Sequence, residues 1–511
     1  MQTSPIPNRG FPRWCERAII GCIFLIAVSA PHSIAATQTF WLLGLLFWVL
    51  RLALRPRPRL FRTPVDYWLL GFFVLSGVSG VFSYSPIVSI GKMRGASLFT
   101  IVYLVAQNVR SLRLVHLLAL TLIGSCMINV LLTAGEFAFG RGVKVQGVTA
   151  ASPLAKAVFH TRTVVQPTPI VDGDTVWEVD GKPIGNPDEL AAALAGGSGM
   201  LNTTVSGAAK VSIYRVEWMP VLEVPRGKLL PGNTALEQLG ISGWSRGRDW
   251  RATGFYGHWV TYAEVLQLIA SLALGLFLAA QQKKSLYGGL LLVAVVGLVF
   301  ALAMTVTRAS WVGFALSAAV MLALSVSRRT LLIAVAFAIP IVLGGVILLQ
   351  MRRNVGFIDA KDQSTSWRET VWREGFDLLV SKPRHLLVGV GMDSIKGHWR
   401  EWGLFDNGRL PIGHMHSNLL QIALERGVPA LIVWLILLGV YARMLFGLVR
   451  MEGLAEIRGI ALGALGGLVG FFTSGLVHYN WGDSEVVTVV YFIMGLSLAV
   501  NSIVRGQAQS R

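Results

Sequence analysis

The segment His414-Met415-His416-Ser417-Asn418-Leu419-Leu420-Gln421 closes a polar stretch, residues 351–429, that lies between two long apolar runs. The same stretch contains Trp367-Arg368-Glu369 and Val388-Gly389-Val390-Gly391-Met392-Asp393. Histidine and arginine side chains therefore collect in one segment of an otherwise membrane-like sequence. This contrast predicts that the apolar runs hold a polar, functional segment at a membrane surface.

The composition excludes a soluble enzyme. The chain has 511 residues, of which 53% are hydrophobic and 14% are charged, whereas about a quarter of the residues in a soluble domain are charged. The net charge of +18 would suggest nucleic-acid binding in a soluble protein. Here the basic residues lie mostly in short segments between apolar runs, where they set membrane orientation. We therefore expect no nucleic-acid partner.

The cysteines and the N-terminus carry no sign of processing or of a metal centre. All three cysteines lie in or beside apolar runs, so we expect no disulfide framework, no metal site and no cofactor. The first apolar run lacks a clear cleavage site, and another run follows it directly. We therefore expect the first span to remain in the protein. The cysteines are Cys15, Cys22 and Cys126.

The apolar runs predict an all-α polytopic membrane protein with about 12 transmembrane helices. A helical span needs about twenty mainly apolar residues. The predicted spans are residues 18–35, 37–54, 65–83, 94–110, 114–135, 256–280, 286–306, 309–327, 331–350, 428–448, 459–478 and 485–503.

The distribution of Lys and Arg predicts the orientation of these spans. The basic residues of the short connections fall on one side of the alternating topology, so both termini are expected in the cytoplasm. The expected organisation is five spans in residues 1–135, an outward insert at 136–255, four spans in 256–350, a large outward loop at 351–427 and three spans in 428–511.

The first outward segment predicts a small α/β domain at about residues 143–224. Residues 171–184 have the pattern of two short strands around an Asp180-Gly181 turn, and Asn186-Pro187 opens a short helix. This pattern resembles the second half of a PDZ domain. It implies either a structural cap or a module that binds an envelope protein partner by adding a strand to an open sheet edge.

Three residues are candidates for a catalytic site at the outer membrane surface: Arg308, Arg368 and His416. An outward-facing transferase has no access to cytoplasmic nucleotide sugars and would use a lipid-linked donor with a lipid diphosphate as leaving group. Guanidinium groups bind phosphate oxygens through two parallel hydrogen bonds and stay charged. Histidine can accept a proton from a sugar hydroxyl near neutral pH. Taken singly, the arginines could equally be an interfacial anchor and a solvated loop residue, and the histidine an ordinary interfacial one.

Together these motifs resemble the O-antigen ligase and polymerase superfamily of membrane glycosyltransferases. Residues 305–310, Thr-Val-Thr-Arg-Ala-Ser, are similar to its Thr-x-Ser-Arg motif, with Thr307 in place of Ser. Residues 366–391 resemble its Arg…Trp…Pro…Gly-x-Gly run, and His416-Ser417 followed by Gly427 resembles its His-Asn/Ser-x9-Gly signature. The resemblance covers most of the chain apart from the insert.

The resemblance implies a metal-independent reaction in the bacterial inner membrane, at its extracytoplasmic face. His416 would be the general base, while Arg308 and Arg368 would bind the diphosphate of an undecaprenyl-diphosphate-linked glycan. The acceptor would be a glycolipid such as a lipid A-core sugar for a ligase, or a second lipid-linked glycan for an O-antigen or exopolysaccharide polymerase. The sequence leaves these two open.

Further candidate substrate-binding residues flank these motifs. Lys92 and Arg94 are expected in a short outward turn, as lipid-phosphate ligands or as helix-end anchors. Arg251 begins an Arg-x-x-Gly segment that would line the donor entrance, Asn418 follows His416, and Asp483 belongs to a polar, aromatic outer turn suited to sugars or to an interfacial belt.

Two other classes of protein fit the sequence less well. A polar-lipid transporter should carry ionisable residues near the bilayer midplane and often has repeated halves, and neither is evident here. A membrane-anchored PDZ-like adaptor would not need twelve spans.

Overall fold

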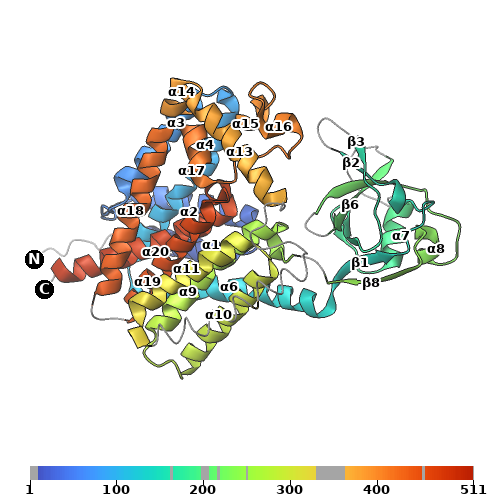
Figure 1. The fold of residues 1–511 in the computed structure, drawn as a ribbon. Helices are drawn as coiled ribbons and strands as arrows, with labels where there is room; N and C mark the ends of the chain where they lie inside the picture. Colours follow the sequence, from blue (N-terminus) through green and yellow to red (C-terminus); the bar gives the residue numbers. More distant parts are fainter. Residues whose placement is uncertain are drawn as a thin grey trace, which may run out of the picture. The chain divides into compact units, whose positions relative to one another are not determined.

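The computed structural model describes residues 10–160, 165–196, 207–215, 219–248, 251–329, 344, 363–451 and 455–509. The chain forms two compact units. The larger comprises Met1–Val130 and Ala252–Arg511, and the smaller comprises Leu131–Arg251. Figure 1 shows that the larger unit is helical and that the sheet belongs to the smaller one.

The described part of the larger unit is built from long apolar helices. In the described ranges, nine segments are long and apolar enough to cross a membrane, which confirms an all-α, multi-pass membrane fold. These segments are α2 (Ile34–Ala53), α4 (Pro86–Ala96) continued through η1 (Ser97–Phe99) into α5 (Thr100–Asn108), α6 (Leu112–Phe139), α9 (Trp259–Ala279), α10 (Leu286–Met304), α11 (Arg308–Ser325), α18 (Val428–Arg450), α19 (Ala455–Gly475) and α20 (Ser484–Gln509).

The predicted count of twelve spans stays a prediction. Helices α1 (Gly10–Ser29) and α3 (Asp66–Val81) coincide with two further predicted spans, whereas the predicted span 331–350 lies outside the described residues apart from residue 344.

One predicted boundary is wrong. The span expected at 94–110 begins at Pro86, where proline occupies the first helical turn. Lys92 and Arg94 therefore lie on helix α4 and not in a turn. The hydropathy pattern missed this because two charged residues interrupt an apolar run whose helix continues through them.

Glycines allow α9 and α19 to pack backbone against backbone. A Cβ atom added to Gly275 would lie 2.3 Å from the backbone nitrogen of Gly463, and one added to Gly463 would lie 2.7 Å from the Cα of Leu272. Close approach of small residues is a main source of helix association in membranes, where burial of apolar surface drives little. The α9–α19 pair therefore forms the densely packed support of the outer polar residues.

The smaller unit contains one antiparallel sheet. The strand order is β3-β2-β7-β6-β4-β1-β8, and β5 pairs with β4. The strands are β1 (Arg141–Gln146), β2 (Val158–His160), β3 (Val165–Pro167), β4 (Thr175–Val179), β5 (Lys182–Pro183), β6 (Ala208–Tyr214), β7 (Val221–Pro225) and β8 (Gly243–Gly247), with η2 (Leu154–Lys156), α7 (Pro187–Ala195) and α8 (Ala235–Leu239) between them.

The local pattern predicted for the insert is confirmed. Strands β4 and β5 pair around the Asp180-Gly181 turn, and α7 begins after Asn186, whose side chain accepts a hydrogen bond from the Glu189 backbone N–H at 2.9 Å. The relation to PDZ domains remains a prediction.

The polar segment folds into short helices with its own apolar core. Val371, Val390, Phe405, Met415 and Leu424 are among the buried side chains of this core. The helices are α13 (Gln363–Val380), α14 (Pro383–Val388), α15 (Ile395–His398), α16 (Leu404–Gly408) and α17 (Asn418–Arg426).

The glycine contact predicts that Gly463→Leu destabilises the protein. A leucine side chain has no space against α9, so we expect a loss of about 1–3 kcal/mol in the free energy of unfolding, measured by thermal unfolding in lipid nanodiscs. Gly439→Leu on α18 is the matched control, because a Cβ there meets nothing within 4 Å. Equal melting of the two variants would show that the close approach does not support the fold.

Candidate functional site

A strained turn presents His416. Its φ of +46° lies in the left-handed region, which non-glycine residues rarely adopt. Two hydrogen bonds of the Met415 backbone hold this turn. The Met415 N–H donates to Oε1 of Gln421 at 2.6 Å, and the Met415 carbonyl accepts from Nε1 of Trp372 at 2.8 Å. Strain of this kind persists only where the surroundings enforce it, and it is common at functional sites.

The structure brings His416 and Arg368 together. The His416 ring lies 4.3 Å, centroid to centroid, from the ring of Trp367, and 4.0 Å from the ring of His414. Arg368 donates from Nε to the carbonyl of Val477 at 3.3 Å. Burial, followed by the positive charges of His414 and Arg368, lowers the pKa of His416 to about 2. The imidazole is therefore neutral at physiological pH.

Arg308 begins α11 at the same outer end of the bundle. The Oγ atoms of Ser271 and Ser317 lie 2.8 Å apart, and a Cβ on Gly313 would lie 3.0 Å from Oε1 of Gln267. From the first pair to the second, the residue number falls by four on α9 and by four on α11. The two helices therefore run parallel. One further step pairs Ala309 with Ala263, so Arg308 and Glu264 lie within about one helical turn of each other along the bundle.

Glu264 connects α9 to the turn before α20. Its Oε1 lies 2.7 Å from Nδ1 of His478, and both side chains are buried. Burial and then the charge of Arg368 lower the pKa of His478 to about 3. The three predicted residues thus lie at one end of the helix bundle, with Glu264 and His478 as buried neighbours that the sequence motifs did not identify.

Two glycines bring the polar segment against neighbouring helices. Gly389 and Gly391 have φ values of +74° and +98°. A Cβ on Gly389 would lie 2.4 Å from the Glu425 carbonyl carbon, and one on Gly391 would lie 1.9 Å from Oγ of Ser83. The Gly-x-Gly run therefore serves close backbone approach, consistent with the turn expected from the sequence.

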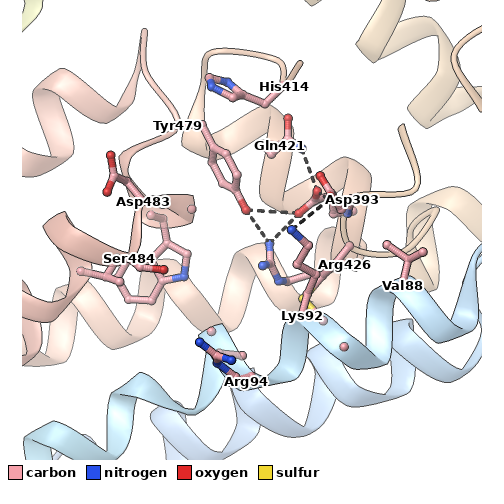
Figure 2. A pocket seen from close by; sticks show the side chains of 18 of the residues that line it. Val88, Lys92, Arg94, Asp393, His414, Gln421, Arg426, Tyr479, Asp483 and Ser484 are labelled. Carbon is pink, nitrogen blue, oxygen red and sulfur yellow. Dashed lines mark hydrogen bonds and ion pairs between the residues drawn. The ribbon is translucent and has the colours of Figure 1, made fainter. Parts of the chain in front are cut away.

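A cavity of about 770 Å³ opens beside His414. Figure 2 shows that its walls come from α4, the polar segment and the turn before α20, with Lys92 and Arg94 on one side and Asp483 and Ser484 on another. Of the predicted substrate-binding residues, Lys92, Arg94 and Asp483 line this cavity.

The inner wall of the cavity is a buried ionic network. Nη1 of Arg426 lies 3.1 Å from Oε2 of Glu425 and 3.3 Å from the hydroxyl of Tyr479, which itself donates to Glu425 at 3.2 Å. Oε1 of Glu425 accepts from Nε2 of Gln421 at 2.9 Å and from the backbone N–H of Asp393 at 2.9 Å. The sequence motifs did not identify Glu425 or Arg426 as a network, although an adjacent charged pair directly before an apolar span was a signal.

Two further ion pairs adjoin this network through Asp393. Asp393 binds Nζ of Lys92 at 3.0 Å and Nζ of Lys396 at 2.8 Å. Burial opposes ionisation of Asp393, but the two lysines lower its pKa overall. Arg94 donates to the neutral Oε1 of Gln38 at 2.9 Å. Lys92 thus reaches a counter-charge inside the cavity, which explains how α4 carries charge within a candidate span.

The other two candidates have different surroundings. Asn418 is buried, donates to Oδ1 of Asn480 at 2.5 Å and accepts from the Trp481 backbone N–H at 3.1 Å. Its position favours a structural role in holding the outer turn, and substrate binding by Asn418 stays a prediction. Arg251 ends the smaller unit and also stays a sequence-based prediction.

Asp483 combines two structural contacts with its place in the cavity wall. Its Oδ2 accepts from the hydroxyl of Thr261 at 2.6 Å, and its Oδ1 accepts from the backbone N–H of Glu485 at 3.1 Å, at the start of α20.

Comparison with known proteins agrees with this geometry. Residues 292–435, from α10 into α18, match the family model described as O-Antigen ligase. This region of the chain is therefore similar to the O-antigen ligase family. The matched region includes Arg308, Arg368 and His416, and the family is one of ligase- or polymerase-type membrane enzymes acting on lipid-linked glycans. No curated protein matches the chain.

The buried histidines predict acid lability. Burial, with smaller effects of neighbouring positive groups, lowers the pKa of His414 to about 4 and that of His416 to about 2. The unfolded chain takes up these protons near pH 6.5, so the unfolded state binds more protons than the folded state below that pH. The free energy of unfolding should therefore fall as the pH decreases from about 6.5 towards 4.

The measurement is the melting temperature of the wild type and of the double variant His414→Gln/His416→Gln across this range. We expect the variant to lose less stability on acidification. Parallel curves would contradict the assignment of acid lability to these two side chains.

Proposed function

We propose that this membrane enzyme transfers a glycan from an undecaprenyl-diphosphate donor to an acceptor hydroxyl at the extracytoplasmic face of the bacterial inner membrane, with both chain termini in the cytoplasm. The observation that carries the proposal is the placement of Arg368 beside His416, with Arg308 at the same end of the bundle. A base and two guanidinium groups are the parts that displacement of a diphosphate requires.

The proposed step is a direct displacement. His416 removes the proton of the acceptor hydroxyl while that oxygen attacks the anomeric carbon of the donor sugar. The new carbon–oxygen bond forms as the bond between the anomeric carbon and the diphosphate oxygen breaks, and the electron pair leaves with the diphosphate. Arg308 and Arg368 bind the departing charge. Attack opposite the leaving group inverts the anomeric configuration.

The low pKa of His416 connects donor binding to catalysis. In the free protein burial, followed by the neighbouring His414 and Arg368, lowers the pKa of His416 and makes it a weak base. A diphosphate bound to Arg368 would offset that positive charge and place negative charge near the imidazole, which raises its pKa. The base therefore gains strength when the donor is bound.

Ligase and polymerase are the two forms of this function. A ligase transfers the glycan to a lipid A-core sugar, and a polymerase transfers it to a second lipid-linked glycan. A polar-lipid transporter is a weaker alternative, because Glu264 lies only in the second turn of α9 and the other polar candidates gather at the outer end of the bundle.

The smaller unit would recruit a protein partner. Strands β3 and β8 end the sheet, so either could accept an extended segment of an envelope protein as an added strand. The alternative is that the unit is a structural cap.

The test follows release of undecaprenyl diphosphate by the purified protein in lipid, with lipid A-core or a second lipid-linked glycan as acceptor. We expect His416→Gly and Arg308→Ala to lose at least about a hundredfold in turnover, as for removal of a general base or of a preorganised charge. Glycine tolerates the left-handed φ, so His416→Gly should melt close to the wild type and separate catalysis from folding.

Arg409→Ala is the matched control, because this arginine lies in the same polar segment with an 81% exposed side chain. Product on lipid A-core identifies a ligase, and product on the second glycan alone identifies a polymerase. Equal turnover of wild type and His416→Gly would reject the catalytic proposal.

A further inference from the structure

The cavity lies beside His414, whereas Trp367 and Arg368 lie beside His416. His414 lines the cavity, and its ring packs on His416, with Nδ1 accepting from the His416 backbone N–H at 3.2 Å. The other neighbour of His416 is Trp367, the residue before Arg368. Neither Arg308 nor Arg368 lines the cavity. A donor diphosphate held by these arginines would therefore leave the cavity free for another molecule.

The charges of the cavity do not suit a diphosphate. Its lining contains four cationic and four acidic side chains. Asp393 is shared by Lys92 and Lys396, and Glu425 is paired with Arg426. The charged lining residues are Lys92, Arg94, Lys396, Arg426, Asp393, Glu425, Asp483 and Glu485.

Two of the acidic side chains would oppose an anion directly. Asp483 contacts Thr261, the backbone at the start of α20 and the carboxyl group of Glu485, and among the described residues neither carboxyl group forms an ion pair with a cation. A diphosphate in the cavity would meet these carboxylates at close range, where like charges repel by several kcal/mol at an effective dielectric constant of about 20.

A glycan suits the same lining. A sugar hydroxyl both donates and accepts hydrogen bonds, so one hydroxyl can bind a carboxylate and an ammonium group at once. The aromatic rings of Tyr479, Trp481 and Tyr491 line the cavity as well and offer apolar faces to sugar rings. The volume of about 770 Å³ lies in the range of pockets that enclose ligands larger than one monosaccharide.

We propose that this cavity binds the acceptor glycan, so that the acceptor hydroxyl reaches His416 past His414 while the donor diphosphate lies on the Arg368 side. The inference rests on the proposed transferase function and assigns the two substrates to separate compartments of its site. Asp483 and Glu485 bind hydroxyl groups of the acceptor sugar, and Arg94, which is exposed at the helix surface, lies where the acceptor enters.

The test separates the Michaelis constants of the two substrates. We expect Asp483→Asn/Glu485→Gln to raise the KM of the acceptor about tenfold or more, as for lost hydrogen bonds to charged groups, while the donor KM changes less than about twofold. Arg368→Lys should raise the KM of the donor and leave that of the acceptor nearly unchanged. Asparagine still caps a helix, so the start of α20 is preserved, and Glu401→Gln, a carboxylate outside the cavity with a 66% exposed side chain, is the matched control.

A binding measurement distinguishes this inference from the function on which it rests. Calorimetry on His416→Ala uses two probes: the oligosaccharide released from lipid A-core or from the lipid-linked glycan, and inorganic diphosphate. We expect Asp483→Asn/Glu485→Gln to weaken oligosaccharide binding about tenfold or more and to leave diphosphate binding unchanged. If the substitutions strengthen diphosphate binding and leave oligosaccharide binding intact, the cavity is a donor site and the inference is wrong. Absence of transfer by the wild type with every acceptor would reject the proposed function, while the calorimetry would still decide what the cavity binds.

Discussion

The carboxylate of Glu425 joins several separate segments beside the candidate site. It binds Arg426, Tyr479, Gln421 and the backbone of Asp393. These partners belong to α17, the turn before α20 and the segment after the Gly-x-Gly run. A buried charge is costly unless it is paired, and removing one partner leaves the other uncompensated at a cost of about 3–5 kcal/mol. The network therefore enforces one arrangement of segments that are distant in sequence.

The same network reaches the turn that contains His414 and His416. Gln421 donates to Glu425 and accepts from the backbone of Met415, so the position of the His414–His416 turn depends on the ionic wall of the cavity. This connection explains how the fold maintains a histidine at a φ of +46°. A substrate that moves the cavity wall would also alter the hydrogen bonds of Gln421 to Glu425 and Met415. The proposed acceptor site and the proposed base would therefore change position together.

Sequence reasoning selected the candidate site residues by their chemistry. Arg308, Arg368 and His416 followed from three short motifs, and the structure places Arg368 at His416 and Arg308 at the same end of the bundle. It was least successful for α4, where charged residues interrupt an apolar run, and for Arg426 and Glu264. A single arginine or glutamate beside a span looks like an interfacial residue until its partner is known, and these partners lie far away along the chain.

The sequence by itself determined the membrane class, the helical architecture, the antiparallel turn of the insert and the residue types of the site, because span length, apolar content and turn chemistry are local properties. Only the tertiary structure decided which polar groups meet. The distances from His416 to His414 and Trp367, the pairing of Glu264 with His478 and the matched charges of the cavity all depend on the packing of separate helices. That packing arises from close glycine contacts and buried ion pairs between elements distant in sequence, and no local pattern encodes them.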